Sequence, residues 1–283
     1  MDGYLVPELA KKNMQYDMIE QHTDLPKFPY SRSKLLYIFL NKYSPLEGIS
    51  ELFSLVTSLV QMGLDTHDLV DVGTEHAEMK KMRTRQLRVL AGDYFSSRFY
   101  HLLSQAGQVE AVHSLSQAIA EVNRLKINLY MKMKKFKLTA DEYFQQRIDI
   151  KSQLFLVFSK YMDGKSQKQW SELLLSITKC ELITEELDRM TQNKNLKDSW
   201  GYWYLINHVT HEEQEVLKTE SSNESLIQSF LLKYNIKLKL HQMLEKQWQE
   251  ISDSFHSINN KSLQHELEKL GQPFRNYITA SKV

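Results

Sequence analysis

One histidine and several aspartates follow an apolar run in the stretch QMGLDTHDLVDVG, residues 61–73. Carboxylate oxygens bind Mg²⁺, whereas the histidine imidazole suits zinc, iron or nickel better. On a helix, His67 shares a face with Asp71, and Asp68 is also a neighbour of Asp71. The spacing therefore permits a metal site, although acidic residues at the end of a helix are also commonly a solvated surface.

Long helices must position these side chains, because the sequence contains few helix breakers. None of the five prolines lies between Leu46 and Gln272, and the whole chain has nine glycines. Apolar residues recur at helical spacing, so the sequence predicts an all-α fold. After a short helix and an irregular arm, we expect helices at about 31–43, from 47 into the acidic stretch, at 85–107, 108–131, 139–162, 166–192, 199–218, 222–258 and 261–281.

Two of these helix ends carry specific signals. Gly107 is well placed as a C-terminal cap, where glycine readily adopts the left-handed conformation. Thr139 and Glu142 have the spacing of a capping box at a helix N-terminus. We expect one all-α domain over 1–283, made of an N-terminal helix and arm (1–30), a central part (31–163) and additional C-terminal helices (164–283).

The overall composition is that of an ordinary soluble globular protein. Lysine plus arginine total 36 and aspartate plus glutamate total 35, so no basic excess points to nucleic acid or an anionic membrane. The single cysteine, Cys180, excludes an internal disulfide and favours a cytoplasmic location. The apolar runs are too short to span a bilayer, and the N-terminus does not resemble a signal peptide.

Two segments resemble the first half of a trans-polyprenyl diphosphate synthase, HDLVD (67–71) and LRVLAGDYFSSRFYHLLS (87–104). Those enzymes typically carry a D-D-x-x-D segment, then Arg-Arg-Gly, then a helix reading close to V-L-A-G-D-Y. The last element matches at 89–94. In the first element, Asp68 and Asp71 stand at the second and last aspartates, and His67 replaces the first.

The other metal-binding elements of that family are not retained. The second aspartate-rich motif has only TEELD (184–188) as its nearest equivalent, which we interpret as an exposed helical face. Lys151, which stands where the family places a lysine near the diphosphate, is interpreted as a surface lysine. The interval expected to hold Arg-Arg-Gly supplies positive charge but not that motif, through Lys80, Lys81, Arg83 and Arg85.

A conserved architecture without its metal ligands resembles a narrower family, component one of the heteromeric heptaprenyl diphosphate synthases. The segments LDTHD (64–68) and RQLRVLAGDYFS (85–96) carry this resemblance. It implies a degenerate isoprenoid synthase fold with no catalytic residue and no metal or other cofactor on this chain, the degenerate motif being His67, Asp68 and Asp71.

The same resemblance implies a heteromer with a catalytic large subunit that binds Mg²⁺ through two intact aspartate-rich motifs. That complex would condense isopentenyl diphosphate onto an allylic diphosphate, farnesyl diphosphate, to make the menaquinone side-chain precursor. The contribution of this chain would be structural and regulatory, and the chain alone would be inactive. Residues that would face the product tunnel or the subunit interface are Met62, Gly63, Leu64, Asp93 and Tyr94.

Two aromatic-rich segments are further candidates for the subunit interface or for the core. They are GDYFSSRFY (92–100) and SWGYWYL (199–205). Aromatic residues are enriched where subunits meet, but they also fill protein cores. Asp93 lies among apolar neighbours, so we expect it to be buried and hydrogen-bonded to a tyrosine or an arginine.

Two other functional classes are compatible with the sequence. One is a stand-alone metal-dependent helical hydrolase built on His67 and Asp68. It would need further histidines, and those available lack the ordered spacing of that class: His76, His101 and His113. The other is a helical adaptor unrelated to isoprenoids. The sequence also leaves the product length, hexaprenyl or heptaprenyl, and the stoichiometry of the complex open.

Overall fold

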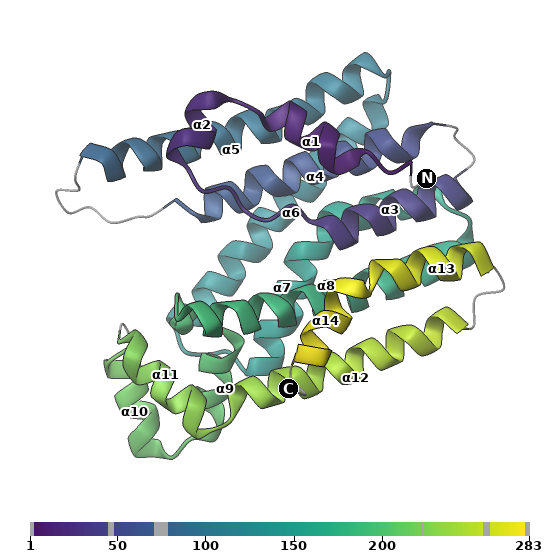
Figure 1. Cartoon of the computed structure of the whole chain (residues 1–283). Helices are drawn as coiled ribbons and strands as arrows, with labels where there is room; N and C mark the ends of the chain where they lie inside the picture. The colour runs from purple at the N-terminus through teal and green to yellow at the C-terminus, as the bar shows by residue number, and fades with distance from the viewer. Residues whose placement is uncertain (1–2, 45–47, 71–78, 222, 257–260, 281–283) are drawn as a thin grey trace. The chain divides into compact units, whose positions relative to one another are not determined.

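The computed structural model describes residues 3–44, 48–70, 79–221, 223–256 and 261–280. Within these ranges all regular secondary structure is helical, which confirms the predicted all-α class (Figure 1). In the same ranges, no helix has both the length and the hydropathy needed to cross a bilayer.

The chain forms two compact units, each built from two stretches of sequence. Unit 1 comprises residues 1–120 and 154–170, and unit 2 comprises residues 121–153 and 171–283. Both units contain non-consecutive segments, because three helices begin in one unit and end in the other: α6 (Val109–Lys134), α7 (Ala140–Leu156) and α8 (Gly164–Gln192). The expected single domain stays a prediction.

Unit 1 is a bundle of helices around a core rich in phenylalanine. Phe53 lies against Phe158 and Tyr161 with ring centroids 4.9 and 5.0 Å apart, and Phe39 lies 5.6 Å from Trp170. Its helices are α1 (Val6–Met14), α2 (Asp17–His22), α3 (Tyr30–Tyr43), α4 (Ile49–Asp68), α5 (Met79–Gln105), the first half of α6, the last residues of α7, the 3₁₀ helix η1 (Val157–Tyr161) and the first residues of α8.

Helix α4 is buried over most of its length, which its sequence explains. Apolar residues alternate with small hydroxyl residues, so few side chains require water. Thr57 and Ser58 donate hydrogen bonds to the carbonyls of Phe53 and Ser54 one turn earlier, at 2.6 and 2.7 Å. These bonds satisfy hydroxyls that would otherwise be costly to bury.

Unit 2 has a core centred on α9, where Trp200, Tyr202 and Trp203 are all buried. Its helices are the second half of α6, most of α7, most of α8, η2 (Leu196–Asp198), α9 (Trp200–His208), α10 (His211–Thr219), α11 (Glu224–Lys233), α12 (Ile236–His256), α13 (Lys261–Leu270) and α14 (Gln272–Ala280).

Both predicted end signals are confirmed. Gly107 has φ of 68° after α5, and the next backbone N–H donates to the carbonyl of Leu103 at 2.8 Å. Thr139 and Glu142 exchange two hydrogen bonds, of 3.0 and 3.1 Å, before α7. The N-terminal region differs from the expectation, since two short helices, α1 and α2, precede the irregular arm.

Three predicted long helices are wrong, because each is interrupted. The helix expected at 199–218 divides into α9 and α10, where Thr210 and Glu213 form a second capping box. The helix expected at 222–258 divides into α11 and α12 at Asn235, which has φ of 53°. The helix expected at 261–281 divides into α13 and α14 on either side of Gly271.

Candidate functional site

The predicted motif lies at the C-terminal end of α4, where this helix packs closely against α5. The contacts run in opposite directions along the two helices, so α4 and α5 are antiparallel neighbours. Gly63 of α4 faces Gly92 and Ser96 of α5, and a Cβ added to Gly63 would lie 2.9 Å from the Gly92 carbonyl oxygen and the Ser96 nitrogen. The absence of a side chain at Gly63 therefore permits the close approach of the two backbones.

His67 is positioned by the second glycine of this contact. A Cβ on Gly92 would lie 2.7 Å from Cε1 and Nε2 of His67, so the imidazole occupies the space that a larger residue would fill. Nε2 of His67 lies 3.2 Å from Oδ1 of Asp93. The histidine that replaces the first aspartate is thus directed towards α5 and is paired with the aspartate of the GDY segment.

Asp93 differs from the expectation in both burial and partner. Its side chain is 67% exposed, whereas we predicted a buried residue bonded to tyrosine or arginine. Its partner is His67, whose side chain is 33% exposed. An exposed carboxylate on the outer side of α5 keeps part of its hydration, so it does not need the buried donor that the apolar sequence context suggested.

The remaining motif residues do not assemble into a described metal site. Asp68 is exposed at the end of α4, and Asp71 lies outside the described residues, as does His76. Across the part of the chain that the structure describes, no three histidine, cysteine or acidic side chains are grouped so that they could hold a metal ion. A paired imidazole beside one described aspartate does not provide the oxygen ligands that Mg²⁺ prefers.

A buried polar chain that sequence reasoning missed leads from the interior of unit 1 to this end of α4. Nη1 of Arg32, a residue 3% exposed, donates to Oε1 of Gln61 at 3.2 Å, and Nε2 of Gln61 donates to Oδ1 of Asp65 at 2.9 Å. The guanidinium also lies over the ring of Phe155, 5.0 Å from its centroid. The four-residue spacing of Gln61 and Asp65 was the available signal, but nothing in the sequence indicated Arg32.

Another residue that the sequence did not indicate joins α5 to the end of α4. Nη1 of Arg88 donates to the carbonyl oxygen of Leu69 at 2.9 Å. Because the last carbonyls of a helix have no partner within it, this guanidinium helps to satisfy the end of α4.

The TEELD segment is not the exposed face that we predicted. Nη2 of Arg147 lies 3.3 Å from Oε2 of Glu185, and Nζ of Lys151 lies 3.9 Å from Oε1 of the same carboxylate. The side chain of Lys151 is only 16% exposed, so its interpretation as a surface lysine is also wrong. Lys151 and Glu185, which stand near two motifs of the polyprenyl diphosphate synthases, thus interact with each other within unit 2.

The other two carboxylates of TEELD also have partners within unit 2. Glu186 is 2% exposed, and its Oε2 accepts a hydrogen bond of 2.9 Å from the backbone N–H of Trp200 at the start of α9. Oδ1 of Asp188 accepts a hydrogen bond of 2.7 Å from the hydroxyl of Tyr277 in α14. These carboxylates therefore connect α8 to α9 and α14.

Burial raises the pKa of Glu186 above its usual range, and the nearby guanidinium groups of Arg189 and Arg147 oppose this shift. Because this pKa is higher in the folded than in the unfolded protein, the contribution of Glu186 to stability is fully present at pH values below its unfolded-state pKa, where the carboxyl is protonated in both states. Stability is then lost as the pH rises through the folded pKa. We therefore expect Glu186→Gln to become progressively more stable than the wild type as the pH increases, because glutamine stays neutral and keeps an oxygen acceptor for Trp200.

Urea unfolding at a series of pH values measures this difference directly. The exposed Glu250→Gln is the matched control, and it should change the free energy of unfolding by less than about 0.5 kcal/mol at every pH. A Glu186→Gln difference that stays constant with pH would contradict the raised pKa of Glu186.

The five predicted tunnel or interface residues fall into two groups. Met62, Gly63 and Leu64 are buried within unit 1, whereas Asp93 and Tyr94 are exposed on α5. The structure thus separates interior positions from surface positions, and their roles stay predictions.

The two aromatic segments also differ in location. In the segment 199–205, the tryptophans and Tyr202 are buried in unit 2, which agrees with the alternative that they fill the core. In the segment 92–100, Phe95 and Phe99 are buried, but Tyr94 and Tyr100 are 39% and 49% exposed. The exposed aromatic side chains are therefore those of the α5 segment, Tyr94 and Tyr100.

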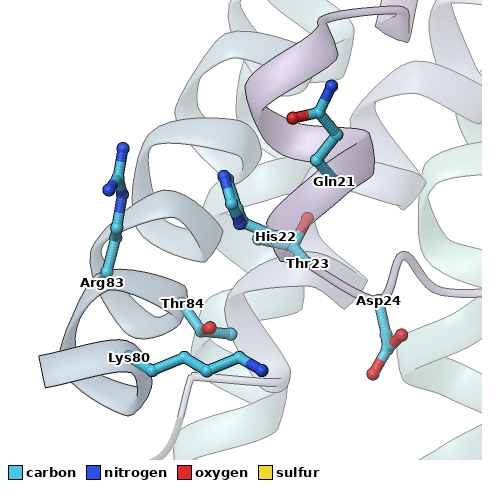
Figure 2. Close-up of a pocket in the computed structure, with 7 residues that line it drawn as sticks. All are labelled: Gln21, His22, Thr23, Asp24, Lys80, Arg83 and Thr84. Carbon is cyan, nitrogen blue, oxygen red and sulfur yellow. The ribbon is translucent and has the colours of Figure 1, made fainter. Parts of the chain in front are cut away.

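A polar pocket of about 340 Å³ lies in unit 1 between the end of α2 and the start of α5 (Figure 2). Lys80 and Arg83, two of the basic residues in the interval where Arg-Arg-Gly was expected, contribute its positive charge. Asp24 supplies a carboxylate on the α2 side. The lining residues are Gln21, His22, Thr23, Asp24, Lys80, Arg83 and Thr84.

The sequence model of one protein family matches residues 16–195, more than half of the chain, and this family is described as heptaprenyl diphosphate synthase (HEPPP synthase) subunit 1. The chain belongs to this heptaprenyl diphosphate synthase subunit 1 family. The match includes the α4–α5 contact and the TEELD segment, so both lie within the part that defines the family. This confirms the resemblance seen in the sequence.

A curated relative agrees with the family. The chain is 41% identical over 75 residues to heptaprenyl diphosphate synthase component 1 from Geobacillus stearothermophilus. This similarity covers 26% of the chain and 31% of the length of the relative.

Solved structures show the fold of this subunit 1 family member. Geranylgeranyl pyrophosphate synthase from Lactobacillus brevis has a TM-score of 0.72 at 10% identity, covering 95% of this chain and 93% of that one. Heptaprenyl diphosphate synthase from Staphylococcus aureus has a TM-score of 0.63 at 13% identity, covering 97% and 96%. The predicted isoprenoid synthase fold is confirmed.

Proposed function

We propose that this chain is the non-catalytic, structural and regulatory subunit of a heptaprenyl diphosphate synthase. In this proposal a catalytic large subunit carries both aspartate-rich motifs and binds Mg²⁺. The complex adds isopentenyl diphosphate units to farnesyl diphosphate in the cytoplasm and makes the side-chain precursor of menaquinone. Membership of the subunit 1 family supports the proposal, since the words subunit 1 imply a second component.

The observation that carries the proposal is the use of the acidic residues by the protein itself. At the first motif, His67 replaces an aspartate and pairs with Asp93. At the second, Glu185 is paired with Arg147 and Lys151. An imidazole at position 67 supplies no carboxylate oxygen, and a carboxylate paired with an arginine and a lysine is poorly available to Mg²⁺. The ion that stabilises a departing diphosphate would then have to be held by another chain.

The outer side of α5 is the surface that we propose for contact with the catalytic subunit. Leu90 is 62% exposed, and Val89, Tyr94 and Tyr100 are between 38% and 49% exposed. Neighbouring exposed apolar and aromatic side chains on one helix are typical of a surface that another protein covers. Met62 and Leu64, which are buried on α4, would then support the wall of a product tunnel.

The direct test is reconstitution of prenyl transfer. The purified chain is mixed with farnesyl diphosphate, labelled isopentenyl diphosphate and Mg²⁺, with and without a catalytic chain that contains two intact aspartate-rich motifs. We expect no labelled polyprenyl diphosphate from the chain alone and long-chain product from the mixture. Turnover by the chain alone would contradict the proposed non-catalytic role.

Two variants separate the surface contact from the degenerate motif. Leu90→Glu should prevent assembly with the catalytic chain and lower product formation at least about tenfold, because it places a charge in a desolvated contact. His67→Ala is the control at the motif and should change turnover of the complex by less than about twofold. A complex that keeps full activity with Leu90→Glu would exclude this side of α5 as the contact.

A further inference from the structure

A segment of unit 2 concentrates positive charge that the composition of the whole chain conceals. Residues 122–140, VNRLKINLYMKMKKFKLTA, contain six basic residues and no acidic residue, whereas the whole chain has a formal net charge of only +1. Large apolar residues alternate with the lysines. We call residues 122–140 the basic segment; it comprises the second half of α6 and the turn before α7 (Figure 1).

One side of the basic segment is packed into unit 2. Val122 is 1% exposed and Leu129 is 7% exposed, and both lie on the same side of α6 because they are seven residues apart. Leu138, after the helix, is 3% exposed. The segment is therefore held in place by an apolar face of its own.

The opposite side of α6 exposes large apolar side chains. Ile127 is 63% exposed, Tyr130 is 61% exposed and Met131 is 45% exposed. Their spacing of three and four residues places them together on one helix face. Soluble helices normally present polar residues on the face that lies opposite the core, so this apolar stripe requires an explanation.

Basic side chains border this stripe. Lys132, Lys134, Lys135 and Lys137 are all exposed. Arg124 is paired with Glu121 at 2.6 Å, so one positive charge is partly balanced. The pKa of Glu142 is lowered mainly by the hydrogen bond that its carboxylate accepts from the backbone N–H of Thr139, and further by the positive charge of Lys132.

The turn that follows α6 extends the same surface. Phe136, which stands between Lys135 and Lys137, has φ of 49° and is 38% exposed. The ring lies 6.1 Å from that of Trp203, so the turn is fixed to the core of unit 2. Capping of α7 by Thr139 and Glu142 fixes the other end of the turn.

We propose that the basic segment docks this protein on an anionic lipid membrane. Lysines would contact the phosphate headgroups while Ile127, Tyr130 and Met131 enter the boundary between headgroups and acyl chains. Clusters of four to eight basic residues on an amphipathic helix are typical of binding to anionic lipids, and exposed apolar residues beside them supply the second, hydrophobic contribution.

The combination of charge and apolar exposure distinguishes a membrane from other anionic partners. Nucleic acid binding depends mainly on phosphate contacts and would gain little from an exposed isoleucine and methionine on the same helix face. An acidic protein surface would satisfy the lysines but would leave the apolar stripe opposite charged groups. A bilayer of anionic lipids presents both the negative surface and an adjacent apolar layer, so it fits both features.

Vesicle sedimentation of the full chain tests the proposal. We expect binding to vesicles of phosphatidylglycerol and phosphatidylcholine, weaker binding at high salt, and little binding to phosphatidylcholine alone. Each lysine near an anionic bilayer contributes roughly a fivefold factor, so Lys134→Glu/Lys135→Glu should reduce binding by roughly twenty-five-fold or more. Ile127→Ser should reduce it by about tenfold, because the buried apolar contact is lost.

Matched changes elsewhere in unit 2 provide the controls. Lys237→Glu/Lys246→Glu alters the charge equally at exposed positions of α12, and Leu238→Ser removes a leucine that is 57% exposed. Both should bind vesicles like the wild type, and all variants should support prenyl transfer in solution with the catalytic chain. The proposal would be overturned if the wild type did not sediment with the anionic vesicles, or if the α12 variants lost as much vesicle binding as the variants of the basic segment. It would also be overturned if the variants of the basic segment lost assembly with the catalytic chain and kept their lipid binding.

Discussion

Replacing Trp203 with alanine is expected to lower the free energy of unfolding by about 3–5 kcal/mol, the range for removal of a large buried aromatic side chain. Trp203 is 2% exposed and meets Tyr202 edge to face, with ring centroids 5.7 Å apart. Its removal would leave a cavity in unit 2 that the neighbouring side chains could fill only in part. Urea unfolding followed by far-UV circular dichroism measures the loss.

The same experiment decides whether the aromatic segment 199–205 belongs to the core. Leu232→Ala is the control, because Leu232 is 66% exposed on α11, and its effect should be below about 0.5 kcal/mol. If Trp203→Ala left stability unchanged and weakened only the assembly with a catalytic chain, the tryptophan would be an interface residue and the core assignment would be wrong.

Helices were predictable from the sequence, but several of their interruptions were not. Apolar spacing and the proline at position 45 predicted α3, and Gly107 predicted the end of α5. Asn235 divides α11 from α12 in the left-handed conformation, which asparagine adopts more readily than most residues but which its presence does not require. The break at Thr210 did carry a signal, since Thr210 and Glu213 have capping-box spacing.

The candidate site was predictable in its position but not in its contacts. His67 and Asp93 are far apart in the sequence, and their pairing depends on the close approach of α4 and α5. Gly63 and Gly92 make that approach possible, and a single sequence does not reveal which glycines face each other. The pairing of Glu185 with Lys151 has the same origin, because it joins different helices of unit 2.

Surface properties were hidden by averaging over the chain. The near-equal totals of acidic and basic residues argued against an anionic membrane as partner, yet the basic segment contains no acidic residue. Its apolar stripe became visible only when the exposed fractions of Ile127 and Tyr130 were known. Periodicity identifies an amphipathic helix, but it does not show that apolar residues lie on both sides of that helix and that only one side is buried.

Introducing alanine at Gly63 is expected to destabilise the protein by about 1–3 kcal/mol, the range for overpacking of a well-packed interior. The new Cβ would lie 2.9 Å from the Gly92 carbonyl oxygen, the Ser96 nitrogen and the Ser96 Cβ. Two of these atoms belong to the backbone of α5, so they can move away only if the helix itself shifts. This cost should exceed the gain of about 0.5–1 kcal/mol that alanine brings over glycine within a helix.

Gly164→Ala is the matched control, because a Cβ at this first residue of α8 would meet no atom within 4 Å. That variant should be as stable as the wild type or slightly more stable. Hydrogen exchange localises the effect of Gly63→Ala, which should increase exchange in α4 and α5 more than in α9. If Gly63 instead lined an open product tunnel, alanine would leave stability and exchange unchanged and would alter the length of the prenyl product formed with the catalytic chain. Either result separates a glycine that joins two helices from one that leaves room for a growing chain.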